Sequence, residues 1–258
     1  MLRCGRRRLA FAVGVVVLMT LAVAGPFGEA ADFRIDNAVY VGDQPKPVSQ
    51  TTTLFHQKAV YDFLTDPVEV VIFERQAGRA VLLDVSRQLR TSLATRQVAA
   101  FTESLQRAAA GQEDPFIRFL AQPTFKEQFA AAERELTLSS RWLTYRLRLL
   151  EPDDPSVVTQ YREFSDWSVQ ISALLNPGRS SLPYSRLRVN AALAQRGALA
   201  AEVRLTQRPK QGEALVLRSR HQFHAHLTSA DQNRIAQTQK WMRTFTEVGI
   251  QQYRKPSE

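Results

Sequence analysis

Three histidines near the C-terminal end come closest, by type and spacing, to a metal-binding or catalytic motif. The stretch LRSRHQFHAHLTS contains His221, His224 and His226, three of the four histidines of the chain. If EALVLRSRHQFHAHLT is a strand, alternation places His224 and His226 on one face, about 7 Å apart, and His221 on the other. Two histidines at that spacing bind zinc only when further ligands come from elsewhere in the fold.

The neighbours of this histidine pair argue against a metal. Arg218 and Arg220 share its face, and two fixed positive charges oppose the binding of a divalent cation. We therefore expect a solvated polar strand face, with no bound metal and no cofactor. His221 is predicted to be half-buried at the end of the apolar face, and His56, beside a hairpin turn, to be exposed.

Other catalytic motifs are not recognisable in the sequence. There is no Gly-x-Ser-x-Gly elbow and no glycine-rich phosphate loop, and the single cysteine is Cys4. We interpret Asp62, Asp66 and Asp84 as turn or strand-end residues. They would act as acid and base only if the fold brought two of them together. We assign no catalytic residue, and an enzyme is the less favoured class.

The first thirty residues have the segment order of a secretory signal peptide. Four arginines precede the apolar run LAFAVGVVVLMTLAVA, and the small residues of GPFGEAAD follow it. The run is shorter than the roughly twenty apolar residues that span a bilayer. We predict a leader over residues 1–30 that is cleaved after Ala30, or after Ala24, and an uncleaved anchor is the alternative. The protein is therefore expected to be exported to the periplasm or cell envelope.

Composition limits what the rest of the chain can be. Residues 31–258 are enough for a single α+β domain with a core that needs no disulfides, followed by a loose C-terminal tail. The formal net charge is +9, but no block of five like charges occurs, so we expect no nucleic-acid partner. A mildly basic surface suits anionic lipid head groups or acidic polysaccharide, although scattered solvated charge explains it too. Membrane contact is expected only through the leader or transiently.

The elements that must position these residues begin with a run of antiparallel strands. FRIDNAVYVG alternates, but Asp36-Asn37 resembles a turn that would break it. TTTLFHQKAVYDFL is typical of a hairpin around Gln57-Lys58, VEVVIFER is apolar on both faces like an inner strand, and RAVLLDVSRQLRTSL returns. The regular turn signals predict an antiparallel meander.

Helices and further strands follow. Capping residues predict helices that begin at Thr95, at Asp114-Pro115 and at Asp154-Pro155, and another from Pro183 to Arg196. TFKEQFAAAERELTLSSRWLTYRLRLL is predicted to form strands with a turn near Glu133-Arg134, and ALAAEVRLTQ and EALVLRSRHQFHAHLT to form two more. Ser229 with Gln232 is predicted to be the capping box of a last helix.

The leader, the stretch VYDFLTDPVEVVIFERQAGRAVLLDVSRQLRTSL and the helix after it resemble the outer-membrane lipoprotein carrier family and its relatives. RGALAAEVRLTQ, followed by a long strand, resembles the closing strands of such proteins. The resemblance implies a strongly curved antiparallel sheet, an incomplete barrel, with helices against its opening. The middle region, from Pro155 through PYSRLRVNAALAQRG, is longer than that family leads us to expect, and no individual ligand residue is carried over.

Three functions remain open for an exported α+β protein of this kind. The first is a carrier that binds a lipid, an acyl group or a lipoprotein in an apolar cleft, because helices that cover a curved sheet incompletely leave a groove. The alternatives are an exported hydrolase whose polar site is assembled by the fold, and a structural envelope protein without a small ligand. For the carrier, we expect the ligand-binding walls to include Val71, Phe73, Leu82, Tyr145, Tyr161 and Phe164.

Overall fold

The computed structural model describes residues 31–66, 68–177, 181–208 and 212–254, so the predicted leader lies outside the described residues. The strands are β1 (Phe33–Val41), β2 (Ser49–His56), β3 (Ala59–Leu64), β4 (Glu69–Glu74), β5 (Arg79–Asp84), β6 (Leu89–Ala94), β7 (Lys126–Ala130), β8 (Glu135–Ser139), β9 (Leu143–Leu150), β10 (Leu199–Gln207), β11 (Leu215–His224) and β12 (Thr246–Glu247).

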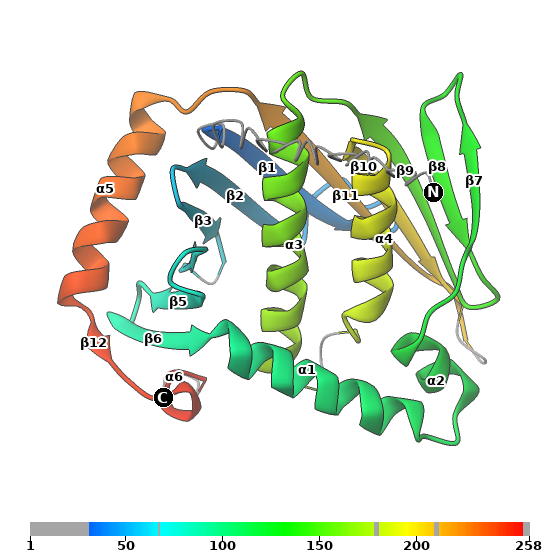
Figure 1. Ribbon diagram of the computed structural model, residues 1–258, viewed down its shortest axis with the longest axis horizontal. Helices are drawn as coiled ribbons and strands as arrows, with labels where there is room; N and C mark the ends of the chain where they lie inside the picture. Colours follow the sequence, from blue (N-terminus) through cyan, green and yellow to red (C-terminus); the bar gives the residue numbers. More distant parts are fainter. Residues whose placement is uncertain (1–30, 67, 178–180, 209–211, 255–258) are drawn as a thin grey trace, which may run out of the picture.

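These strands form one sheet in the order β12-β6-β5-β4-β3-β2-β1-β11-β10-β9-β8-β7. Each strand pairs antiparallel with its neighbour except β12, which runs parallel to β6. The described strands at the two ends of this order, β12 and β7, do not pair with each other, so the curved sheet stays open (Figure 1). The structure therefore confirms the predicted α+β fold, a curved antiparallel sheet that forms an incomplete barrel with helices against it.

The helices are α1 (Thr95–Ala110), α2 (Pro115–Ala121), α3 (Pro155–Leu175), α4 (Tyr184–Gln195), α5 (Ser229–Thr244) and α6 (Ile250–Tyr253). Helices α3 and α4 lie side by side against one face of the sheet, which we call the inner face (Figure 1). Helix α5 lies at one end of the molecule against the opposite, outer face. Helix α1 leaves the β6 side and runs towards α2 and the β7 side (Figure 1).

The predicted helix starts are largely confirmed, because their signals are local. Thr95 is the first residue of α1 but does not cap it, since Ala94 is the N-cap and the Thr95 hydroxyl donates to the carbonyl of Gly78. Asp154 accepts a hydrogen bond from the backbone N–H of Ser156 at 2.8 Å, with Pro155 in the first turn of α3. The capping box of α5 is one residue earlier than predicted. Thr228 and Asp231 form it, not Ser229 and Gln232.

Strand β1 differs from the prediction, since it continues through Asp36 and Asn37 without a turn. Asp36 pairs with Thr52 of β2 on one side and with Gln222 of β11 on the other. Two ladders therefore hold this segment extended, although Asp and Asn disfavour strands when considered alone. A central place in the sheet overrides the local turn preference.

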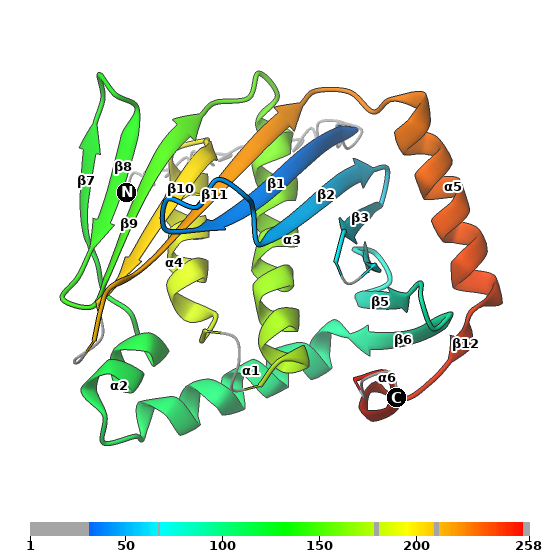
Figure 2. The same ribbon diagram turned by 180° about the vertical axis from the view of Figure 1, so that it is seen from behind.

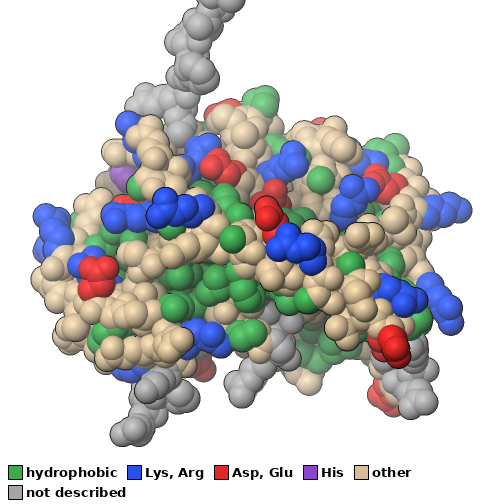
Figure 3. All heavy atoms as spheres, turned by 60° about the horizontal axis from the view of Figure 1, so that its bottom comes forward, with side chains coloured by type: hydrophobic (Ala, Val, Ile, Leu, Met, Phe, Trp, Pro, Cys, Tyr) green, Lys and Arg blue, Asp and Glu red, His purple; other side chains and the backbone are tan. Residues whose placement is uncertain are grey.

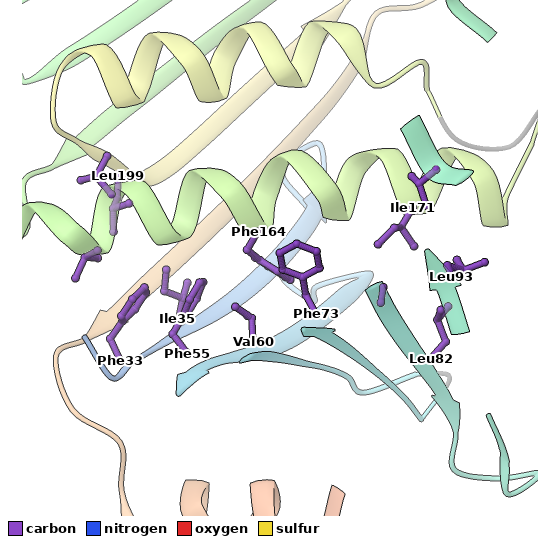
Figure 4. Close-up of a cluster of buried hydrophobic side chains, with 14 of the residues drawn as sticks. Phe33, Ile35, Phe55, Val60, Phe73, Leu82, Leu93, Phe164, Ile171 and Leu199 are labelled. Atoms are coloured by element: carbon purple, nitrogen blue, oxygen red, sulfur yellow. The ribbon is translucent and has the colours of Figure 1, made fainter. Parts of the chain in front are cut away.

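The core consists of three apolar clusters. The α3 cluster lies between α3 and the inner face of β1–β6 (Figure 4). The α4 cluster lies between α4 and the inner face of β8–β10. The α5 cluster lies on the outer face of β2–β5 and includes Ile235 and Phe245. Strands β3–β5 are thus covered on both faces, which explains why the centre of VEVVIFER, Val70 to Phe73, is apolar on both sides. Among the described helices, none is long and apolar enough to cross a membrane.

Candidate functional site

The six predicted wall residues all lie on the inner side of the fold. Phe73, Leu82 and Phe164 are buried in the α3 cluster, and Val71 and Tyr161 pack against it while remaining partly exposed. Tyr145 is buried in the neighbouring α4 cluster. The structure therefore brings five of the six together and places the sixth beside them.

Aromatic packing fills much of the space beneath α3. Phe55 stacks on Phe33 with ring centroids 3.9 Å apart and meets Phe164 edge-on at 5.6 Å. Phe73 contacts Trp167 at 6.0 Å. Phe164 and Phe73 thus act as packing residues of a dense core, as Figure 4 shows for their neighbourhood.

Beside this dense region lies an interior polar set, consisting of Thr53, Asp62, Tyr161, Arg186 and His221. Thr53 and Asp62 face each other across the β2–β3 pair, and the hydroxyl of Thr53 donates to the Asp62 carboxylate at 2.7 Å. Thr53 is fully buried. The side chains of Thr53 and Asp62 are therefore turned into the protein.

The prediction that Asp62 is a turn or strand-end residue is wrong. Asp62 lies in the middle of β3, and alternation places its side chain on the same face as that of Val60, which belongs to the α3 cluster. Burial raises the pKa of Asp62 to about 6, and the hydrogen bond from Thr53 opposes that rise. The alternation of VYDFL could have indicated that Asp62 is buried, because it places Asp62 on the same strand face as the inward-facing Val60.

His221 lies on the inner face, as predicted, and its partner is Ser219, whose Oγ is 2.9 Å from His221 Nε2. Burial, with the positive charge of Arg186 adding to it, lowers the pKa of His221 to about 3, so the ring is neutral. Its Nδ1 is buried and has no hydrogen-bond partner among the described residues. A buried polar atom left unpaired in this way is available to a ligand.

The other histidines occupy separate places. His224 faces outward, as predicted, with Nε2 3.0 Å from Asp36 Oδ2. His226 follows the end of β11 and is exposed, so the expected strand pair of His224 and His226 does not form. His56 is not exposed as predicted, because it is half-buried with Nδ1 2.6 Å from Asp32 Oδ2. No group of three or more potential metal ligands occurs within the described ranges.

Arg186 supplies a positive charge next to the neutral members of the polar set. Its charge acts on Tyr145, Tyr161 and His221. Burial raises the pKa of Tyr161. Among the described residues Arg186 forms no ion pair within 4 Å, but its charge acts on Asp166, whose carboxylate accepts from Asn190 at 2.7 Å and lies 3.6 Å from Arg162.

The interior polar set is not sealed from solvent. Asp62, Tyr161 and His221 remain partly accessible, yet burial shifts the pKa of each. An apolar strip continues from them on the inner face near one end of β1, β10 and β11, where partly exposed side chains stand outside the α3 cluster: Val39, Val41, Leu205 and Leu217.

Helices α3 and α4 leave almost no gap between them, since the space there is about 10 Å³. A larger apolar pocket of about 380 Å³ lies between α1, α2 and the end of α3, and its lining includes Phe101, Leu105, Ile117 and Leu120. Its size is that of a small-molecule site. Figure 3 shows hydrophobic side chains gathered near the middle of the face that lies at the bottom of Figure 1.

Comparisons with known proteins add little beyond the fold. No family model matches the chain. No curated protein matches it. Among solved structures, a LolA superfamily protein from Nitrosomonas europaea is similar at 8% sequence identity, over 79% of this chain and 90% of that chain, with a TM-score of 0.28. A likeness at that level carries no argument about a ligand, so the function must be argued from the interior polar set and the apolar strip.

Proposed function

We propose that this protein is a carrier that binds one amphipathic molecule, an acyl chain with an acidic head group, on the inner face of its sheet. The observation that supports this most is the deep yet accessible polar set beside an apolar strip. Both halves of an amphipathic ligand would find partners there. An exported carrier of a lipid or a lipoprotein is consistent with the predicted leader, and contact with a membrane would then be transient.

The positive charge of Arg186 favours an acid as the head group, in competition with Asp62, which is negative above about pH 6. Arg186 has no ion pair within 4 Å among the described residues, although its charge acts on Asp166, and His221 is neutral. A charge inside a protein is costly unless an opposite charge accompanies it. A carboxylate or phosphate would accept hydrogen bonds from Arg186 and from the Tyr161 hydroxyl, and charge-assisted bonds of this kind are the strong ones.

The apolar strip supplies the driving force for the chain. Each methylene group that leaves water contributes about 0.8 kcal/mol. Ten methylenes would contribute about 8 kcal/mol before the cost of immobilising the ligand. Val71 and Tyr161 would border the chain, whereas Phe73, Leu82 and Phe164 would form the packed wall behind them and Tyr145 would lie near the head group.

A hydrolase is less well supported. The hydrogen bonds of the described residues do not join Asp62 to His221, since each has a hydroxyl partner of its own, Thr53 and Ser219 respectively. A general acid and base must reach the reacting atoms together. We therefore treat Asp62 and His221 as groups that shape the ligand space and not as catalytic residues.

The test is a titration with a fluorescent fatty acid and with a fluorescent amine of the same chain length. We expect saturable binding of the acid, weakened at least tenfold in Arg186→Gln, because charged hydrogen bonds contribute about 1.5–3 kcal/mol. Arg188→Gln, an exposed position of the same helix, is the matched control. If the amine binds as well as the acid, the head-group assignment is wrong. If neither binds saturably, the carrier proposal fails and a structural role is favoured.

A further inference from the structure

Part of the outer face of the sheet has none of the described helices over it. Helix α5 covers the outer face of β2–β5, whereas β9, β10, β11 and β1 lie open when the molecule is seen from behind (Figure 2). We propose that this open face docks the protein onto the surface of an anionic lipid bilayer. The proposal does not depend on the ligand of the inner face.

Three arginines stand in a line across the open face. Arg204 of β10 pairs directly with Arg146 of β9 on one side and with Arg218 of β11 on the other. We call these three residues the arginine row. Neighbouring strands are about 4.8 Å apart, and like charges at directly opposed positions destabilise a sheet. Such a row is costly to the free protein, and an anionic surface laid against it would remove the cost.

The protein itself neutralises the arginine row only weakly. The nearest carboxylate to Arg204 is that of Asp43 at 3.8 Å, and the Asp43 side chain is 88% exposed. Arg146 and Arg218 have no ion pair with any described residue. Arg218 stacks over the ring of Tyr40 at 4.8 Å, and its Nε is buried without a hydrogen-bond partner in the described structure. The row therefore has unused capacity to bind anions.

The next line of residues carries balanced charge. Arg148 of β9 stands between Glu135 of β8 and Glu202 of β10 in the ladder, and Glu202 lies 3.7 Å from Arg220 of β11. A hollow of about 530 Å³ lies next to them, and its lining includes Ala38, Arg148, Arg220 and Asp36. A hollow of that size beside two guanidinium groups would take a phosphate head group.

The chemistry of this face favours a lipid surface over a protein partner. Stable protein interfaces are centred on buried apolar anchors. The large hydrophobic residues that are exposed in the described structure are Val48, Val68, Phe129 and Leu215, and none stands at an outward-facing position of β9, β10, β11 or β1. Attraction to an anionic bilayer needs only basic residues close to its surface. Charge without an apolar centre is therefore the pattern expected for head groups.

The experiment measures binding to vesicles of phosphatidylcholine alone and of phosphatidylcholine mixed with phosphatidylglycerol, at low and high salt. The variant replaces Arg146, Arg204 and Arg218 by Gln. All proteins are compared in the same full-length form, so that the leader contributes equally. Each basic residue near an anionic surface contributes about fivefold to affinity, so we expect the triple variant to bind the anionic vesicles about 100-fold more weakly.

The matched control removes the same charge elsewhere, by changing the exposed residues Arg96, Arg107 and Arg188 to Gln. It should retain most of the binding. Equal weakening in this control would show that only net charge matters and would overturn the proposal. So would binding that is insensitive to salt, or a preference for polyglutamate over the anionic vesicles, which would assign the face to an acidic protein.

A second variant guards against misfolding as the cause of lost binding. Replacing the arginine row by Lys keeps the three charges and should keep the binding to anionic vesicles within a fewfold. The Gln variant should also unfold at a higher temperature than the native protein at low salt, because opposed like charges have been removed. Loss of binding in the Lys variant, with the circular dichroism spectrum unchanged, would contradict the charge-based docking proposed here.

Discussion

Replacing Asp62 by Asn should make the protein more stable at neutral pH than the native chain. Burial raises the pKa of Asp62 to about 6 in the folded protein, whereas the ordinary value is 3.8. The folded state therefore binds a proton that the unfolded chain has already released between these two pH values. Stability is highest below the unfolded pKa and falls as the pH rises through about 6, where the buried carboxylate becomes charged.

The size of the effect follows from the two pKa values. Their difference corresponds to a loss of about 3 kcal/mol between pH 4 and pH 8, as an upper figure for a partly accessible group. Asn has the same shape and keeps an oxygen that accepts the Thr53 hydroxyl, which now bonds to Asp62 at 2.7 Å. Asp62→Asn should therefore match the native protein near pH 4 and exceed it by about 2–3 kcal/mol near pH 8.

The assay is urea unfolding of both proteins across this pH range, with the difference between them taken at each pH. Taking the difference cancels the other titrating groups, including His221, whose effect has the opposite sign in acid. Asp66→Asn, which removes an exposed carboxylate after β3, controls for the loss of one charge. A difference between Asp62→Asn and the native protein that is constant with pH would refute the argument that Asp62 is buried in a low-dielectric interior.

Three further outcomes are expected from the same structure. The pKa of His221 is lowered to about 3 in the folded protein from an ordinary 6.5, so stability is lost as the pH falls from 6.5, and His221→Gln should remove up to about 5 kcal/mol of that acid sensitivity in urea unfolding. Thr228→Ala removes the hydroxyl that caps α5 and should cost about 1 kcal/mol by thermal unfolding, and a loss below the error of the measurement would contradict the cap. N-terminal sequencing of the exported protein should begin at Ala31, or at Gly25 for the earlier site, and a chain that starts at Met1 would disprove leader cleavage.

Local signals predicted the kinds of element and many of their ends. Helix α3 begins where the Asp154-Pro155 pair places it, because a cap acts within one helical turn. The two-sided apolar character of VEVVIFER predicted an inner strand, and β4 is indeed covered by helices on both faces of the sheet. The orientation of His221 and His224 followed from alternation, which depends only on strand geometry.

Tertiary structure decided what those elements do. Asp36 and Asn37 stay in β1 because the two neighbouring strands, β2 and β11, supply ladder hydrogen bonds. The pairing with β11 joins segments far apart in the chain, so the local sequence around Asp36 could not predict it. The pKa of Asp62 is a property of the atoms that surround the carboxylate, and those belong to segments distant in sequence, including Tyr161 of α3.

The positions of the arginine row and of Arg186 also depend on the tertiary structure. The arginine row exists only through the register that sets Arg204 of β10 between Arg146 of β9 and Arg218 of β11, and Arg186 belongs to the interior because α4 folds onto the inner face. The sequence by itself determined which segments are helices and strands and which side of each is apolar, since capping and alternation are short-range. Burial, register and the resulting electrostatics were decided by the fold, since each depends on atoms that only the folded chain brings together.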